Sequence, residues 1–147
     1  MRRVAEQSDG AVTNAAFHVV APQGQGRPGV LELEGDFDVD VVPEIDAFLR
    51  RTLGPLYHQD HLVIDLARTT FVDSSFIAFL VRLSATQRAK RRELLLVRPR
   101  GEVRRLLCLV GLPNVVPVFE TVEAAVASVL TGPLPVIPPA FSAVEAC

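Results

Sequence analysis

Short apolar runs along the chain alternate with stretches in which apolar residues recur every three or four positions. Runs of the first kind are typical of strands, and they predict strands over residues 15–20, 30–34, 61–66, 93–97 and 115–119. The run at 61–66 is apolar at nearly every position, so we expect a strand that is covered on both faces. Pro117 has no backbone N–H to donate, which favours an edge position for the last strand.

Helical spacing predicts one helix after each of the last four strands. The first is expected to be capped by Asp40, to carry Pro43 in its first turn and to stop at Gly54. The central helix begins around Asp73, and the last is capped by Thr121. Strands that alternate with helices in this way indicate βαβ units, and therefore an α/β fold with a largely parallel or mixed sheet.

The start of the central helix carries side chains suited to its free backbone N–H groups. Asp73 and Ser74 lie where a helix N-terminus leaves such groups without partners, and Asp and Ser are good acceptors for them. Capping is the commonest role of these residue types at such a junction. For Asp73 it is the interpretation we favour.

A second apolar stripe follows in the same helix. It consists of Phe76, Phe79 and Leu83 and lies beside the expected core stripe of Ile77, Leu80 and Val81. A neighbouring helix could cover the second stripe, or the stripe could be exposed as a hydrophobic docking surface. We favour exposure, with Phe76 as a partner contact beside Ser74.

Composition indicates a globular chain whose charge is unevenly placed. Of the 147 residues, 49% are hydrophobic and 22% are charged, which suits one folded domain. The net charge of −2 gives no overall attraction to nucleic acid. Residues 32–46 hold seven acids and no base, whereas residues 88–105 hold eight of the fifteen basic residues. Such separation can steer a partner onto one face of a protein.

The sequence shows no features typical of secreted, membrane-spanning or nucleic-acid-binding proteins. The N-terminus has no apolar segment of the kind found in signal peptides, and no apolar run approaches the roughly 18 residues of a membrane helix. We therefore expect a cytoplasmic protein with no membrane partner. The basic run at 88–92 has no interleaved aromatic residues, so direct nucleic-acid binding is not expected. Cys108 lies among leucines and is interpreted as a small buried hydrophobe, far in sequence from Cys147.

Cofactor, metal and catalytic sites are not expected either. The glycines at 24, 26 and 29 match G-x-G-x-x-G, but they open a strand rather than a helix, which argues against a dinucleotide site. His58 and His61 would need more ligands within reach to bind zinc. No arrangement of Ser, Cys, His or paired acids is recognisable as a catalytic signature, so we do not expect an enzyme.

Four segments resemble, in the right order, motifs of the STAS domain family, specifically bacterial anti-sigma factor antagonists. Residues 71–75 (FVDSS) are similar to F-[MLIV]-D-S-[ST]-G, and residues 33–38 (LEGDFD) to L-x-G-[ED]-[LF]-D. Residues 98–112 resemble the P-x-x-x-V-x-R-x-L-x-x-x-G-L segment, and residues 121–125 the closing T-x-x-E-A helix. The chain departs from the family at Phe76, where the motif has Gly.

The resemblance implies a STAS-like fold with a four- to five-stranded mostly parallel or mixed sheet and about four helices. The domain would span residues 15–130, between a flexible segment at 1–14 and a Pro-rich tail at 131–147. The implied function is that of an anti-sigma factor antagonist, which binds an anti-sigma factor that is also a serine kinase and so releases a sigma factor. A serine phosphatase would be a second partner, and a homodimer is left open.

The resemblance also assigns roles to individual residues. Ser74 is the implied phosphorylation site, with Ser75 as the fallback acceptor. The partner-binding surface would comprise Asp36, Asp38, Asp73, Ser74, Ser75 and Phe76. Two alternatives remain open: a STAS interaction scaffold that is not phosphorylated, and a module that binds a small ligand or lipid.

Overall fold

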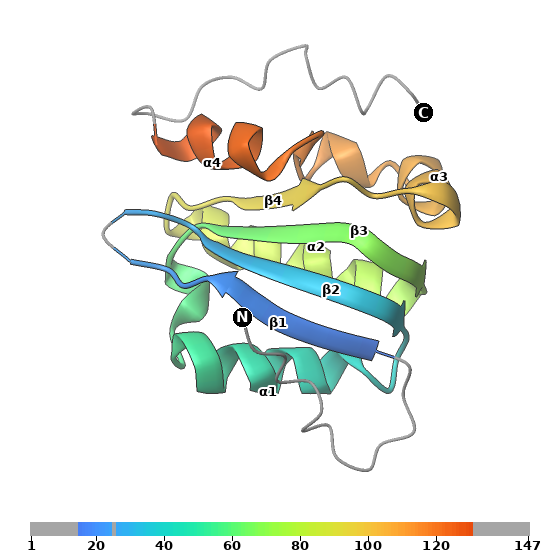
Figure 1. The fold of residues 1–147 in the computed structure, drawn as a ribbon, viewed down its shortest axis with the longest axis horizontal. Coiled ribbons are helices and arrows are strands. Elements are labelled where there is room, and N and C mark those ends of the chain that lie inside the picture. The colour runs from blue at the N-terminus through green and yellow to red at the C-terminus, as the bar shows by residue number, and fades with distance from the viewer. Residues whose placement is uncertain (1–14, 25, 131–147) are drawn as a thin grey trace.

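The computed structural model describes residues 15–24 and 26–130, which form a five-stranded mixed sheet with helices on both faces (Figure 1). The strands lie side by side in the order of the sequence. β1 is antiparallel to β2, and the other neighbours are parallel. Their bounds are Ala15–Ala21 for β1, Gly29–Phe37 for β2, Leu62–Val72 for β3, Leu94–Val97 for β4 and Val118–Phe119 for β5.

A helix connects each pair of parallel strands, because parallel neighbours require a crossover. The α-helices are α1 (Val42–Leu53), α2 (Ser74–Ala89), α3 (Gly101–Leu109) and α4 (Val122–Leu130). Short 3₁₀ turns, η2 (Tyr57–Gln59) and η3 (Leu112–Asn114), follow α1 and α3. This is the α/β architecture that the alternation of patterns predicts.

The sheet separates two apolar cores. Along β3, Leu62, Ile64 and Leu66 point into a large core that is shared with α1, α2 and α3. Val63 points to the other face, into a smaller core with Val129 of α4. Because successive side chains of a strand point to opposite faces, a continuous apolar run is what a doubly covered strand requires.

Pairing between β2 and β3 extends both strands beyond their predicted ends. β2 runs through Gly35 to Phe37, past the predicted end at residue 34, because Phe37 pairs with Val72 of β3. The capping predictions have mixed outcomes. Thr121 Oγ1 accepts the N–H of Ala124 at 3.0 Å, as expected for a cap of α4. Asp40 does not cap α1, since Val41 occupies the cap position and makes no side-chain capping bond.

Other expectations concern individual residues and segments. Pro117 precedes β5, which is an edge strand as predicted. Cys108 is half-buried on α3 rather than fully buried. No helix among residues 15–24 and 26–130 is both long and apolar enough to span a membrane. The predictions for residues 1–14 and 131–147, and for Cys147, lie outside the described residues.

Candidate functional site

The carboxyl ends of β2 and β3 bring the two most informative sequence motifs together. Asp36 is the register partner of Phe71, and the N–H of Asp73 donates to the carbonyl of Phe37 at 3.3 Å. The acidic turn, residues 36–40 at the end of β2, and the serine pair after β3, Ser74 and Ser75, are therefore neighbours in space. They are more than 30 residues apart in sequence, and the parallel pairing of β2 with β3 brings them together.

Asp73 ties these two segments to each other. Its Oδ1 accepts the N–H groups of Ser75 at 2.9 Å and Phe76 at 3.1 Å, which confirms the predicted cap of α2. Its Oδ2 accepts the N–H of Val39, in the turn before α1, at 3.1 Å. One carboxylate thus sets the position of the turn relative to the helix N-terminus.

Ser74 is the first residue of α2, and its side chain is exposed. Since the Asp73 carboxylate already accepts the N–H groups of Ser75 and Phe76, capping of α2 does not require the Ser74 hydroxyl. Among the described residues the structure gives this hydroxyl no hydrogen-bond partner. Ser75, the fallback acceptor, is half-buried one position further along the helix. Of the two, Ser74 is the more accessible hydroxyl.

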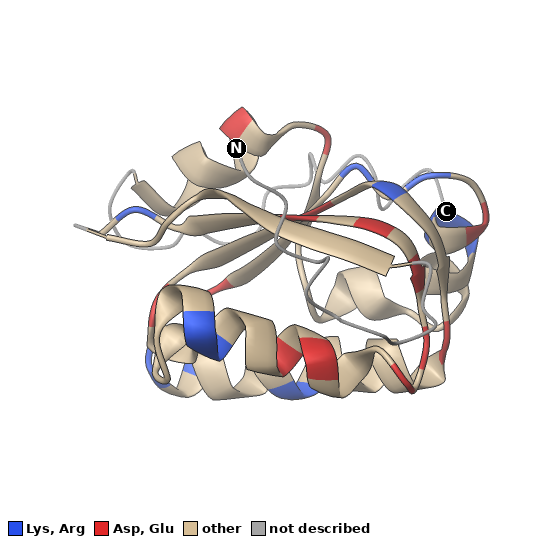
Figure 2. Cartoon of the chain, turned by 60° about the horizontal axis from the view of Figure 1, so that its bottom comes forward, with Lys and Arg blue, Asp and Glu red and all other residues tan. Residues whose placement is uncertain are grey.

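The acidic turn is internally ordered. Asp36 Oδ1 accepts a hydrogen bond from Thr70 Oγ1 at 2.8 Å, and Asp38 Oδ1 accepts the N–H of Asp40 at 3.0 Å. Asp40 thus lies within the turn before α1, and Val41 separates it from the first residue of the helix. Figure 2 shows acidic segments in red at the right, where β2 and β3 end and the connecting turns begin.

Two exposed apolar side chains lie in the same region, and the sequence analysis did not identify them. Phe71 is 48% exposed and Val39 is 59% exposed. Phe71 is exposed because β3 continues past Asp65, its last residue paired with β4. The signal in the sequence was the β-branched and aromatic run after Arg68, which lies beyond the predicted end of the strand at residue 66.

Phe76 is fully buried, so the prediction of an exposed partner contact is wrong. Its ring centroid lies 5.5 Å from that of Phe37 and 6.4 Å from that of Phe79. Phe79 and Leu83 are also buried, whereas Val81, which we had placed in the core, is 39% exposed. The helix turns its aromatic stripe to the core, where the end of β2 supplies an aromatic partner.

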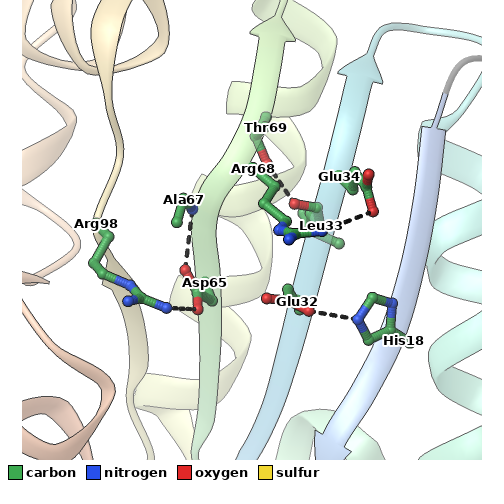
Figure 3. A network of polar contacts seen from close by, with 9 residues as sticks. All are labelled: His18, Glu32, Leu33, Glu34, Asp65, Ala67, Arg68, Thr69 and Arg98. Carbon is green, nitrogen blue, oxygen red and sulfur yellow. Dashed lines mark hydrogen bonds and ion pairs between the residues drawn. The ribbon is translucent and has the colours of Figure 1, made fainter. Parts of the chain in front are cut away.

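A polar network lies on the face of the sheet opposite the large core (Figure 3). His18 Nε2 lies 2.5 Å from Glu32 Oε1, and Arg98 Nη2 donates to Asp65 Oδ2 at 2.6 Å. The hydrogen bond and the charge of Asp65 raise the pKa of Arg98. The adjacent Asp65 and Glu32 therefore each have a basic partner, and Asp65 Oδ1 also accepts the N–H of Ala67. Glu32 and Asp65 are thereby satisfied, whereas His18 Nδ1 is buried and has no hydrogen-bond partner among the described residues.

Neither histidine of the 58–61 loop has the geometry of a metal site. His61 Nδ1 accepts the N–H of Glu93 at 3.0 Å, and burial lowers the pKa of this imidazole, with the charge of Arg92 adding to the effect. His58 packs edge-on against Tyr57. Within the part of the chain that the structure describes, no three side chains of the ligating types converge.

Comparison with known proteins identifies the family. The family model described as "Mlab, STAS domain" matches residues 20–117. No curated protein sequence matches the chain significantly.

Solved structures with the same fold include three anti-sigma factor antagonists or candidates. One, a candidate from Thermotoga maritima, is 18% identical, with a TM-score of 0.64 over 78% of this chain and 94% of its own. Another, from Mycobacterium paratuberculosis, is 22% identical, with a TM-score of 0.62 over 78% and 94%. The Bacillus cell-fate determinant SpoIIAA, in its phosphorylated form, is 20% identical, with a TM-score of 0.54 over 76% and 97%.

At these identities the solved structures establish the SpoIIAA-like fold, a mixed sheet of five strands with four helices. The family model independently spans 98 of the 147 residues and includes both the acidic turn and the serine pair. The chain therefore belongs to the STAS domain family.

Proposed function

We propose that this protein is an anti-sigma factor antagonist whose binding to an anti-sigma factor is switched by phosphorylation of Ser74. The observation that carries the proposal is the exposed hydroxyl of Ser74 at the first position of α2, next to the acidic turn. SpoIIAA, which has the same fold, was solved in a phosphorylated form. The anti-sigma factor would itself be the serine kinase, and a serine phosphatase would reverse the modification.

A phosphate on Ser74 would act on the surface and not on the fold. It would add about 1.5 to 2 negative charges at neutral pH. The helix dipole favours an anion at this end of α2. However, Asp73 already accepts the N–H groups of Ser75 and Phe76, so the phosphate would not replace the cap. The added charge would lie close to the Asp73 carboxylate and would face an arriving partner.

The partner surface in this proposal combines charge with apolar contacts. Asp36 and Asp38 supply acidic groups, and the exposed side chains of Phe71 and Val39 supply hydrophobic area beside Ser74. Such a surface fits a partner with a basic rim around an apolar pocket. Phe71 takes the role of aromatic anchor that the sequence analysis assigned to Phe76.

The test compares phosphorylation and binding in matched variants. The wild-type protein is used to capture its partner, and the recovered protein is analysed by intact mass after incubation with ATP. We expect one phosphate on the wild-type protein and on Ser75→Ala, and none on Ser74→Ala. We expect Ser74→Ala to bind the captured partner as the wild-type protein does, and Ser74→Glu to bind at least tenfold more weakly.

Thr52→Glu is the charge control, because Thr52 is exposed near the opposite end of α1. It should bind like the wild-type protein. Equal affinities for the wild type, Ser74→Ala and Ser74→Glu would reject the switch. Binding of the same partner without any phosphate transfer would instead indicate a STAS interaction scaffold.

A further inference from the structure

A groove runs between α1 and α2, away from the serine pair. Its volume is about 500 Å³, within the range of small-molecule sites. The apolar lining comes from Phe79 and Leu83 of α2 and from Val42 and Pro43 of α1. Phe79 and Leu83 are four residues apart on one face of α2 and are largely buried, and the parts of both side chains that line the groove form its apolar floor.

The polar end of the groove is held in place by Asp46. Its Oδ2 accepts a hydrogen bond from Arg50 Nε at 2.9 Å, and its Oδ1 accepts one from the Tyr57 hydroxyl at 2.8 Å. Burial by itself raises the pKa of Asp46, but the bonds from Arg50 and Tyr57 outweigh it and lower the pKa overall. The carboxylate is thus ionised and satisfied, and it orients Arg50 and Tyr57 at the groove.

Arg82 is the feature that the fold does not explain. It lines the groove three residues after Phe79, on the same face of α2, and it is exposed. Among residues 15–24 and 26–130 its guanidinium has no hydrogen-bond or ion-pair partner. Arg50 and Arg82 against Asp46 leave a net charge of +1 (two minus one) along the groove, whereas the whole chain carries −2.

We propose that this groove binds a small organic anion, with a carboxylate or phosphate head on Arg82 and an apolar body against Phe79 and Leu83. Guanidinium presents its N–H donors in a fork that matches both head groups. An apolar floor beside the unpaired guanidinium of Arg82 suits a ligand that has both an apolar body and an anionic head. The site is separate from the serine pair, and the inference does not depend on the proposed switch.

Intrinsic tyrosine fluorescence can report binding at this groove. Tyr57 is the only tyrosine of a chain without tryptophan, and it lines the groove. Tyrosine fluorescence of the full-length protein can therefore be followed during titration with four probes. Hexanoate and hexyl phosphate carry the two head groups on the same alkyl chain, 1-hexanol lacks the charge, and inorganic phosphate lacks the chain. We expect saturable binding of hexanoate, hexyl phosphate or both, and the stronger of the two identifies the head group.

Substitution of Arg82 tests the head-group contact. Arg82→Gln should weaken binding of the organic anion about tenfold or more, because it removes a charge-assisted hydrogen bond. Arg51→Gln is the matched control, because Arg51 is exposed on α1 and does not line the groove, and it should bind like the wild-type protein. Equal thermal melts would show that both variants are folded.

Three results would overturn the proposal. The first is no saturable signal with hexanoate or hexyl phosphate. The second is equal affinity in the wild type and Arg82→Gln. The third is binding of 1-hexanol or inorganic phosphate as strong as that of the matching organic anion, which would mean that only one half of the ligand is recognised.

Discussion

The ring of Phe76 lies in a row of aromatic side chains that joins the end of β2 to the first turns of α2. It contacts Phe37 on one side and Phe79 on the other. The ring centroid of Phe37 in turn lies 6.2 Å from that of Phe17 on β1. A ring in this position cannot reach a partner without opening the core. The residue that departs from the family motif therefore contributes to stability beneath the site and not to its surface.

Phe76→Ala should lower the free energy of unfolding by about 3 to 5 kcal/mol, because a buried ring is replaced by a cavity. Urea unfolding followed by circular dichroism measures the change. Phe71→Ala is the comparison, since that ring is 48% exposed. It should change stability by less than about 1 kcal/mol and weaken partner binding. A stable Phe76→Ala protein that has lost its partner would contradict this assignment.

His61 should make stability depend on pH between neutral and mildly acidic conditions. Its pKa is lowered from 6.5 in the folded protein by burial and by Arg92, so the unfolded chain takes up the proton first as pH falls. The stabilisation is therefore fully present above pH 6.5 and is lost as pH falls towards the folded pKa. Protonation would also remove the acceptor that His61 Nδ1 offers to the N–H of Glu93.

Urea midpoints measured from pH 7.5 to 5.5 provide the check. His61→Asn retains an acceptor that does not titrate, so its midpoint should fall less than that of the wild-type protein. If the slopes of wild type and His61→Asn agree, the acid sensitivity has another origin.

At the level of elements, α2 and the turn before α1 behave as one unit because they share the Asp73 carboxylate. Helix N-termini ordinarily need an acceptor of their own, and turns ordinarily vary more than the elements they connect. Here a single side chain accepts hydrogen bonds from both. The Asp73 carboxylate therefore adds a direct link between the acidic turn and the start of α2 to the pairing of β2 with β3.

Asp73→Ala should cost about 2 kcal/mol, the upper end for loss of an N-cap, because the bond to Val39 is lost as well. Amide hydrogen exchange should quicken at both Val39 and Ser75. Asp73→Asn keeps an acceptor for the cap and should cost less. Faster exchange at Ser75 alone would show that the turn holds its position without Asp73.

At the scale of the whole molecule, charge is distributed by the fold as well as by the sequence. The parallel strands β2 and β3 end at the same edge of the sheet, so the acids that follow β2 flank the serine pair that follows β3. Other acids, such as Glu32 and Asp65, are matched by basic groups within the polar network. Among the described residues, Asp36 and Asp38 near Ser74 have no basic partner, so their charges are the ones able to act on a binding partner.

Reversal of Asp36 and Asp38 to Lys should slow association with a basic partner, most strongly at low salt, and should flatten the salt dependence of the on-rate. Stopped-flow or surface-binding kinetics measure this. The single reversal Asp38→Lys is compared with Asp60→Lys as its control. Asp60 precedes β3 and so lies at the other end of the sheet. An unchanged on-rate at low salt would limit Asp36 and Asp38 to their roles in the turn.

Periodicity was enough to predict the order and type of the elements, and the motif order was enough to predict the fold. Each strand and helix has its own local pattern, and the caps formed by Asp73 and Thr121 lie within the first turns of their own helices. The meeting of the acidic turn with the serine pair was likewise foreseeable, since parallel strands place their carboxyl ends together. These features depend on local interactions or on simple rules of connection.

The tertiary structure alone decided which face of α2 is buried. This helix is apolar on two adjacent stripes, so its sequence does not distinguish them, and contact with Phe37 places Phe76 inside while Val81 remains partly exposed. The exposure of Phe71 and the groove between α1 and α2 were also beyond reach of the sequence. The exposure of Phe71 depends on how far β3 extends past β4, and the groove depends on side chains from separate elements. Neither can be predicted from the pattern within one element.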